Sequence, residues 1–160
     1  MRLWRIATET REFAAVDLSG KGAAKYPGRW NGPGHAVVYA APTVALAMLE
    51  TAAHVNAMGL PLNKFLVAIE VPDKLWAQRQ EITADQLPVG WAAIPAGLTS
   101  VEVGAKWLTD KSSLVLCLPS VIVPEELVAL INPAHPMADR LSAKKVRAVT
   151  YGAVFRAPGV

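Results

Sequence analysis

The sequence has almost no cysteine: the 160 residues contain one, Cys117, which excludes an internal disulfide. A single cysteine cannot form an internal disulfide, so nothing in the sequence indicates an oxidising compartment. Cys117 lies in the apolar run of residues 114–118. Reactive thiols need an electropositive and partly exposed setting. We therefore expect Cys117 to be a buried core residue and not a nucleophile.

Long apolar runs are also missing. The longest apolar stretch, residues 36–49, is interrupted by Pro42. It falls short of the roughly 20 residues that span a bilayer. The first six residues carry two arginines where a signal peptide needs its apolar core. We therefore expect no membrane association and a cytoplasmic location.

Clustered charge is scarce as well. Charged residues make up 18% of the sequence, and the net charge is +3. Nucleic-acid binding needs clustered basic residues. Only residues 144–147 form a short basic group, which we expect to be a solvated edge. The sequence thus argues against direct nucleic-acid binding, and its mild positive excess fits an anionic small molecule or an acidic protein partner equally well.

Metal-binding and phosphate-loop motifs are missing too. His35, His54 and His135 are far apart and have no cysteine or carboxylate neighbours at metal-ligand spacing. Residues 20–22 lack the continuation that a phosphate-binding loop requires. The nucleophile elbow of serine hydrolases is absent. We expect no metal site and no hydrolase of that type.

The sequence does contain enough apolar residues for a real core. Hydrophobic residues make up 52% of the chain, which is typical of a folded protein and not of a disordered one. A length of 160 residues suits one domain. We find no internal repeat, low-complexity tract or domain boundary, and we therefore expect a single domain over residues 1–160.

Strand patterns outnumber helical ones. Phe65, Val67, Ile69 and Val71 alternate with Leu66, Ala68 and Glu70, which predicts a strand over residues 65–71. Residues 114–118 are continuously hydrophobic, as in a central strand. The remaining predicted strands are residues 3–6, 37–40 and 127–131, with a last strand or hairpin between residues 146 and 155. Strands this numerous, with helices placed irregularly between them, predict an α+β fold and not a doubly wound sheet.

Two helices are predicted. Thr43 is a candidate N-cap for the first, which we expect to continue to Gly59. Thr99 or Ser100 is expected to cap a shorter helix that ends near Leu108. Residues 17–35 are expected to form a long loop, of the kind that often carries function, and residues 73–98 connecting structure.

Glu50 is the most unusual residue of the first predicted helix, whose other residues leave almost no polar face. An ionised carboxylate without a route to water normally acquires partners or a proton. His54 lies four residues later, so both side chains project from one helix face and are within reach of a hydrogen bond. The sequence is equally consistent with a structural and with a catalytic role for a Glu50–His54 pair.

Polar or aromatic side chains stand at four further positions that suit a binding cleft. Arg29 lies in the glycine-rich segment 28–32 and can hold a phosphate with two hydrogen bonds, or stack on Trp30. Tyr39 closes a predicted strand and either stacks on a flat ligand ring or fills the core. Ser120 and Asn132 each follow a predicted strand, where they either reach into a cleft or stabilise a turn.

The order of these motifs along the chain resembles the RES domain, the toxin half of bacterial RES–Xre toxin–antitoxin pairs. The resemblance runs from the opening Leu3-Trp4-Arg5-Ile6 to His135. The motifs that carry it are Gly28-Arg29-Trp30-Asn31, Val38-Tyr39, Leu46-Ala47-Met48-Leu49-Glu50, Leu118-Pro119-Ser120 and Ile131-Asn132-Pro133-Ala134-His135-Pro136.

The resemblance implies a fold and a reaction. It implies an ADP-ribosyltransferase-like fold in which two sheets flank an NAD-binding cleft, and an enzyme that cleaves the nicotinamide–ribose bond of NAD. It also implies Glu50, Arg29 and Tyr39 as catalytic residues, and Arg29, Tyr39, Ser120 and Asn132 as the residues that bind NAD. Transfer of ADP-ribose to a protein or to phosphate would use the same residues. A non-catalytic module that binds a nucleotide or a peptide is the alternative from another class.

The resemblance also implies a partner. An enzyme that drains NAD would harm its own cell, so an inhibitor is expected, namely an Xre-type antitoxin that covers the cleft near Arg29 and Glu50. Contact with DNA would then belong to the helix-turn-helix portion of that partner. A homodimer of the toxin within such a complex is compatible with the resemblance, although no residue of this chain indicates it.

Overall fold

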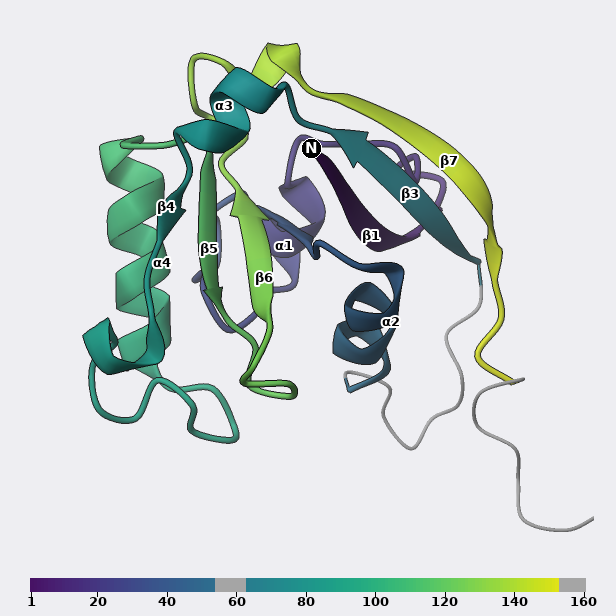
Figure 1. Ribbon diagram of the computed structural model, residues 1–160. Helices are drawn as coiled ribbons and strands as arrows, with labels where there is room; N and C mark the ends of the chain where they lie inside the picture. Colours follow the sequence, from purple (N-terminus) through teal and green to yellow (C-terminus); the bar gives the residue numbers. More distant parts are fainter. Residues whose placement is uncertain (54–62, 153–160) are drawn as a thin grey trace, which may run out of the picture.

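The computed structural model describes residues 1–53 and 63–152, which form two β-sheets with short helices around them (Figure 1). The first sheet has the order β1-β3-β7 and is antiparallel throughout. Its strands are β1 Arg2–Thr8, β3 Lys64–Glu70 and β7 Ser142–Val149. The predicted α+β fold with two sheets and short helices is confirmed.

The second sheet has the order β2-β6-β5-β4. Its strands are β2 Val38–Ala40, β6 Leu127–Ile131, β5 Val115–Pro119 and β4 Gln80–Glu81. Strand β4 is parallel to β5, whereas the other pairs are antiparallel. The two sheets meet where Trp4 of β1 exchanges backbone hydrogen bonds of 2.7 and 2.8 Å with Ala41, just after β2.

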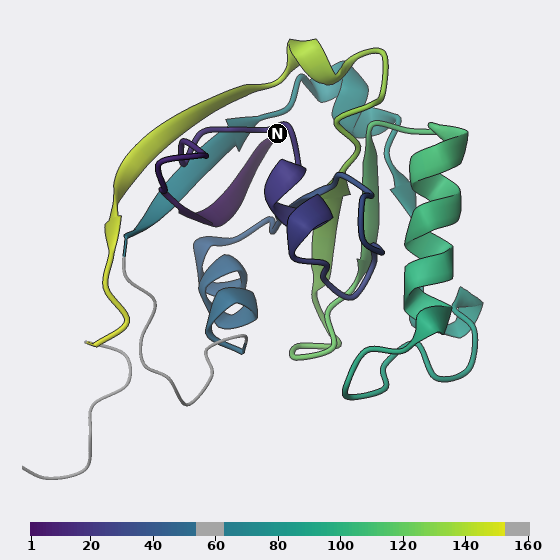
Figure 2. The same ribbon diagram turned by 180° about the vertical axis from the view of Figure 1, so that it is seen from behind.

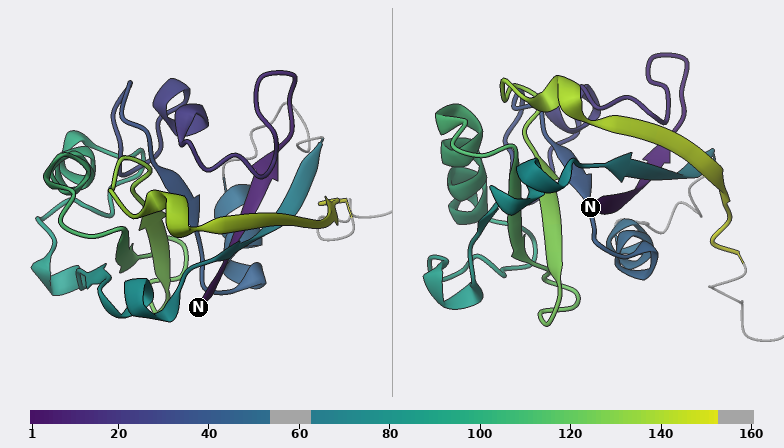
Figure 3. Two further views of the ribbon diagram at one scale, coloured as in Figure 1. Left: turned by 90° about the horizontal axis from the view of Figure 1, so that it is seen from above. Right: turned by 45° about the horizontal axis from the view of Figure 1, so that its top comes forward.

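Four α-helices surround the sheets within the described residues. They are α1 Lys21–Lys25, α2 Val44–Ala52, α3 Asp73–Ala77 and α4 Leu98–Asp110. Helix α4 lies along the second sheet, at the side of the molecule away from β7 (Figures 1 and 3). Helix α1 is best seen from behind, where it lies in front of the strands (Figure 2). No helix of the described ranges is long and apolar enough to cross a membrane.

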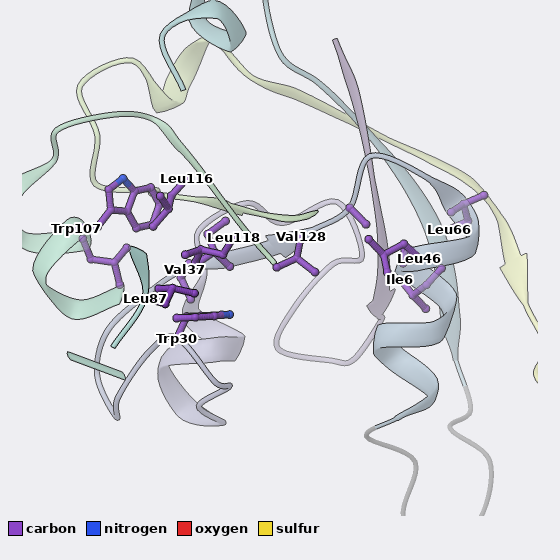
Figure 4. Close-up of a cluster of buried hydrophobic side chains, with 14 of the residues drawn as sticks. Ile6, Trp30, Val37, Leu46, Leu66, Leu87, Trp107, Leu116, Leu118 and Val128 are labelled. Atoms are coloured by element: carbon purple, nitrogen blue, oxygen red, sulfur yellow. The ribbon is translucent and has the colours of Figure 1, made fainter. Parts of the chain in front are cut away.

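The core explains why β5 is hydrophobic at every position. Successive side chains of a strand point to opposite faces. Leu116 and Leu118 belong to a cluster that contains side chains of α2 and α4, whereas Val115 and Cys117 belong to a second cluster made mostly of strand residues. Figure 4 shows the first cluster, with Val128 between its two ends. Cys117 is buried, as predicted.

The local signals for α2 are confirmed at its start but not at its end. Thr43 caps the helix, because its side chain accepts a hydrogen bond of 3.1 Å from the backbone N–H of Leu46. The helix ends at Ala52, well before Gly59. The predicted stop at Gly59 and the predicted partner His54 both lie outside the described residues.

Other predicted boundaries were wrong. Helix α4 begins at Leu98 with Gly97 as its N-cap, so Thr99 and Ser100 are helical residues and not caps. Ser100 instead donates its hydroxyl to the carbonyl of Trp91, 3.2 Å away. The predicted loop 17–35 contains the five-residue helix α1. Strand β7 starts at residue 142, not 146, and its exposed residues include the basic group 144–147.

Candidate functional site

Four segments carry the predicted site residues Arg29, Tyr39, Glu50 and Ser120. Arg29 lies in the turn between α1 and β2, Tyr39 lies in β2, and Glu50 lies near the end of α2. Ser120 follows β5 directly. Its hydroxyl donates a hydrogen bond of 2.6 Å to Oε1 of Glu50 across 70 residues of sequence. This contact joins the end of the second sheet to α2.

The Ser120 hydroxyl is fixed in its role as a donor to Glu50. Its oxygen accepts hydrogen bonds from the backbone N–H groups of Ile122 and Val123, at 3.1 and 3.0 Å. A hydroxyl has one proton and two lone pairs. Because both lone pairs are engaged, the proton points to the Glu50 carboxylate. Ser120 is 1% exposed, so this geometry is shielded from water.

Glu50 itself is half-buried, which corrects the expectation of a carboxylate without a route to water. The helix that carries Glu50 is apolar, but the exposed fraction of each side chain depends on which segments cover that face of the helix. The neighbouring Leu49, although apolar, is 47% exposed. Sequence periodicity does not contain that information. A half-buried carboxylate oriented by a buried serine is accessible to a ligand and still held in one place.

Arg29 lies near enough to this carboxylate for the two charges to interact. The negative charge of Glu50 partly offsets the effect of burial, which lowers the pKa of the Arg29 guanidinium. No ion pair within 4.0 Å joins the two side chains in the described structure. The site therefore presents a cation and a carboxylate close enough to interact, yet not in direct contact.

The Arg29 guanidinium is anchored through one of its nitrogens. Nη1 donates hydrogen bonds of 2.8 and 2.9 Å to the carbonyls of Trp91 and Ala93. Its other N–H groups lie on the remaining edge, which suits two parallel hydrogen bonds to phosphate. The alternative of Arg29 stacked on Trp30 was wrong, since Trp30 is buried and stacks on Trp91, with ring centroids 6.1 Å apart.

Tyr39 holds the segment that contains Arg29. Its hydroxyl accepts a hydrogen bond of 3.0 Å from the Trp30 N–H and donates one of 2.8 Å to Oδ1 of Asn31. Burial raises the pKa of the Tyr39 phenol well above its usual range, so the hydroxyl keeps its proton at neutral pH. A Cβ at Gly28 would lie 2.7 Å from this oxygen, so the close packing requires glycine there.

Asn132 does not lie with the other predicted site residues. Its Nδ2 donates to the carbonyl of Leu108 at 2.9 Å, and its Oδ1 accepts from the N–H of Ala134 at 3.0 Å. Its backbone pairs with Leu114, at the end of β5 opposite to Ser120. Leu114 and Ser120 are six residue steps apart along β5, about 20 Å at 3.3 Å per residue. Asn132 therefore stabilises the turn after β6, which is one of the two roles that the sequence allowed for it.

Arg5 is a buried cation to which sequence reasoning gave no role. It lines a cavity of about 320 Å³ that also includes Thr8, Thr10, Asp17 and Tyr26. Its Nη1 donates to the backbone carbonyl of Asp17 at 2.9 Å, and no ion pair of Arg5 occurs in the described ranges. Burial lowers the pKa of this guanidinium, an effect that the Asp17 charge partly offsets.

Arg5 shares this cavity with Ile6, which belongs to the hydrophobic cluster against which Tyr39 packs. The signal in the sequence was a charged residue inside a predicted strand, where Arg5 stands between Leu3 and Ala7, both buried. A cation in such a position has a structural or a ligand-binding reason.

Replacing Ser120 with alanine tests whether this residue acts on Glu50. We expect turnover of the proposed substrate to fall about tenfold, because a hydrogen bond to a charged group contributes about 1.5–3 kcal/mol. Stability should also fall by about 1–3 kcal/mol, because two backbone N–H groups lose their acceptor. The measurements are kcat on folded protein and the thermal midpoint. A lower midpoint with unchanged kcat would assign Ser120 to the turn alone.

Comparisons with known proteins agree with the motif order. The family model of the RES domain matches residues 2–153. A protein of Sphingobium sp. (strain YBL2) named Prs ADP-ribosylating toxin is 53% identical over 148 residues, which cover 92% of each chain. A protein of Pseudomonas putida named Toxin Res is 39% identical over 143 residues, 86% of this chain and 88% of that protein.

A solved structure shares the fold. The crystal structure of the M. tuberculosis MbcT–MbcA toxin–antitoxin complex contains a chain that superimposes with a TM-score of 0.70. The match covers 95% of this chain and 85% of that chain, at 18% sequence identity. At this identity the likeness establishes the arrangement of the strands and helices, and the chemistry must come from the site itself.

Proposed function

This chain belongs to the RES domain family, and from that premise we propose that it is the toxin of a toxin–antitoxin pair and cleaves the nicotinamide–ribose bond of NAD. One observation carries the proposal. The Glu50 carboxylate is oriented by the buried Ser120 hydroxyl and lies near enough to the Arg29 guanidinium for their charges to interact, with no ion pair between them in the described structure. That arrangement suits a ligand that is anionic at its phosphates and becomes cationic at one sugar carbon during the reaction.

The chemistry requires few groups from the protein. When the bond between C1 of the ribose and the ring nitrogen breaks, the electron pair leaves with nicotinamide, which departs as a neutral molecule. The ribose becomes an oxocarbenium-like cation. A fixed carboxylate stabilises that charge, as the carboxylates of glycosidases do. Glu50 is proposed for this role, and a strong general acid is not needed because the leaving group requires no proton.

The anionic part of NAD needs cations. Arg29 is proposed to hold the pyrophosphate through the guanidinium edge that the Trp91 and Ala93 carbonyls leave open. Arg5 is proposed to supply a second positive charge from the cavity that it lines. The ring of Tyr39 is proposed to line the nicotinamide–ribose end. Asn132 has no part in this proposal, since its side chain is used by backbone groups at the other end of β5.

Replacing Arg5 with glutamine tests the contribution of the cavity. We expect KM for NAD to rise on the order of tenfold with a smaller change in kcat, because a lost hydrogen bond to a charged group costs about 1.5–3 kcal/mol. The measurement is steady-state kinetics at constant ionic strength. If KM is unchanged while the protein loses stability, Arg5 only ties β1 to the loop at Asp17.

Transfer of ADP-ribose to a protein is the second candidate. It is favoured by the similarity to a relative named Prs ADP-ribosylating toxin, at 53% identity. Transfer to inorganic phosphate would use the same carboxylate and the same cation. The three reactions differ in the nucleophile that attacks C1, which is water, a protein side chain or a phosphate oxygen; water gives up a proton in this step, whereas an unprotonated phosphate oxygen does not. Weighing the products of reactions with NAD alone, with added phosphate and with candidate proteins separates them.

A protein partner is also proposed. The similarity to named toxins and to a chain from a toxin–antitoxin complex supports an antitoxin as the partner. This antitoxin is proposed to be of the Xre type and to block access to Glu50 and Arg29. Expression of this chain alone should arrest growth and lower cellular NAD, and co-expression of the adjacent gene should reverse both effects. Glu50→Ala should be harmless. Harmless expression of soluble, folded wild-type protein would contradict the toxin assignment.

A further inference from the structure

Asn31 is the most heavily hydrogen-bonded side chain near the site, and it is 0% exposed. Its Oδ1 accepts a hydrogen bond of 2.9 Å from the backbone N–H of Gly28. Its Nδ2 donates to the carbonyls of Ala23 and His35, at 2.8 and 3.0 Å, with a longer contact of 3.3 Å to the carbonyl of Gly32. One amide thus ties the end of α1 to both sides of the turn that precedes β2.

The Tyr39 hydroxyl completes this network from the sheet. It donates to Oδ1 of Asn31 at 2.8 Å and accepts from the Trp30 N–H at 3.0 Å. Oδ1 of Asn31 therefore accepts two hydrogen bonds and the phenol oxygen accepts one. Both side chains are mostly or fully removed from water, so each of these bonds would be costly to lose.

The two backbone amides that this network holds belong to the residues on either side of Arg29. The N–H of Gly28 is held by Asn31, and the N–H of Trp30 is held by Tyr39. A third contact lies behind the turn, where a Cβ at Gly104 of α4 would meet the Trp30 carbonyl at 1.8 Å. The backbone of Arg29 is thereby fixed from the sheet, from its own turn and from α4.

The hydrogen bonds of Asn31 are compatible with two roles. A buried asparagine commonly stabilises a turn and has no closer connection to chemistry. The network here differs in what it holds, since both anchored amides flank Arg29, whose charge interacts with that of Glu50. The Arg29 side chain then reaches the carbonyls of Trp91 and Ala93, so a shift of its backbone would move the guanidinium relative to the carboxylate.

We propose that Asn31 is a positioning residue for Arg29 and that the Tyr39 hydroxyl acts with it, holding the guanidinium at a fixed place opposite Glu50. This inference rests on the proposed function of Arg29 as the group that binds the phosphates of NAD. It gives Tyr39 a contribution through its hydroxyl in addition to any contact that its ring makes. A misplacement of about 1 Å in a binding group is enough to cost a large factor in rate or affinity.

Tyr39→Phe is the central variant of the test. Phenylalanine keeps the ring and its packing against Gly28 but removes the hydroxyl, so the Trp30 N–H and Oδ1 of Asn31 each lose a partner. We expect KM for NAD to rise about tenfold with kcat changed much less, because a buried backbone donor would lose its hydrogen-bond acceptor. If Tyr39 acts through its ring alone, KM will stay at the wild-type value.

Two further variants make the test specific. Asn31→Ala should raise KM at least as much as Tyr39→Phe. The matched control is Ser113→Ala, which removes a buried hydroxyl that accepts from Trp107 at 2.9 Å and donates to the Val115 carbonyl at 2.9 Å, just before β5. This control should lower the thermal midpoint without changing KM. An equal rise in KM in Ser113→Ala would mean that any buried defect weakens NAD binding, and the inference would be wrong.

Amide hydrogen exchange provides a readout that does not depend on NAD. In Tyr39→Phe the Trp30 amide should exchange about tenfold faster than in the wild type, while amides in the centre of β5 stay unchanged. Faster exchange with an unchanged KM would show that the network holds the turn but does not position Arg29 for binding. If the wild-type protein leaves NAD intact, the proposed function fails, and the exchange rates still decide whether the hydroxyl holds the turn.

Discussion

Glu50→Gln is expected to lower NAD cleavage by about a hundredfold or more, because removing one preorganised electrostatic group typically costs a factor of 100 to 1,000. Glutamine preserves the size of the side chain and leaves a carbonyl oxygen to accept the Ser120 hydroxyl. Only the negative charge is lost. The measurement is kcat at saturating NAD, so that binding does not enter the comparison.

The matched control for Glu50→Gln is Glu102→Gln, which removes one carboxylate from the exposed face of α4. It changes the net charge by the same amount without touching the site. Its turnover should equal that of the wild type. Cleavage near the wild-type rate by a folded Glu50→Gln protein would refute the role of this carboxylate.

Arg29→Lys is expected to raise KM for NAD by on the order of tenfold or more. Lysine retains the charge, but a point charge cannot hold two backbone carbonyls and grip a phosphate with two parallel hydrogen bonds. The carbonyls of Trp91 and Ala93 would lose a shared donor, so the segment that carries them should also loosen. A stability loss of about 1 kcal/mol is expected from those contacts.

Arg11→Lys is the control for this substitution, since Arg11 is exposed and lies away from the site residues in the sequence. It should change neither KM nor stability. A large loss of stability in Arg29→Lys, with KM for NAD unchanged in the remaining folded protein, would assign Arg29 to the structure of the loop alone.

The parts of the fold that the sequence predicted well are those fixed by short-range patterns. Continuous hydrophobicity predicted β5 because its side chains enter two clusters, one on each face. The β6 boundaries were predicted to the residue. The N-cap Thr43 was predicted because its contact lies three residues away, at Leu46. Local signals of this kind need no knowledge of the tertiary structure.

The parts that were missed depend on contacts between distant segments. The exposure of Glu50 depends on what packs against α2, and the Ser120 hydroxyl that orients it lies 70 residues away. Asn31 binds three backbone carbonyls, which carry no sequence signal at all. Asn132 resembled a cleft residue because it follows a strand, but antiparallel pairing placed it at the opposite end of β5 from Ser120. The sequence identifies such residues as unusual, and their roles follow only from the pairing of strands.

The role of Arg5 illustrates the same limit. Its position in a predicted strand was evident, yet a charged residue in a strand most often faces solvent. The structure instead places its guanidinium in a cavity with a backbone carbonyl as its hydrogen-bond acceptor. The cavity forms beyond the point where β1 and β2 meet at Trp4 and Ala41. Which residues face such a space depends on the divergence of two sheets, which no local pattern encodes.

The most direct test of the account is the release of free nicotinamide from NAD by the purified wild-type protein, followed over time beside Glu50→Gln. The account predicts nicotinamide release that is proportional to the concentration of wild-type protein and lower by about a hundredfold or more in Glu50→Gln. Intact NAD after prolonged incubation with folded wild-type protein, with water, phosphate and candidate proteins each offered as acceptor, would contradict it.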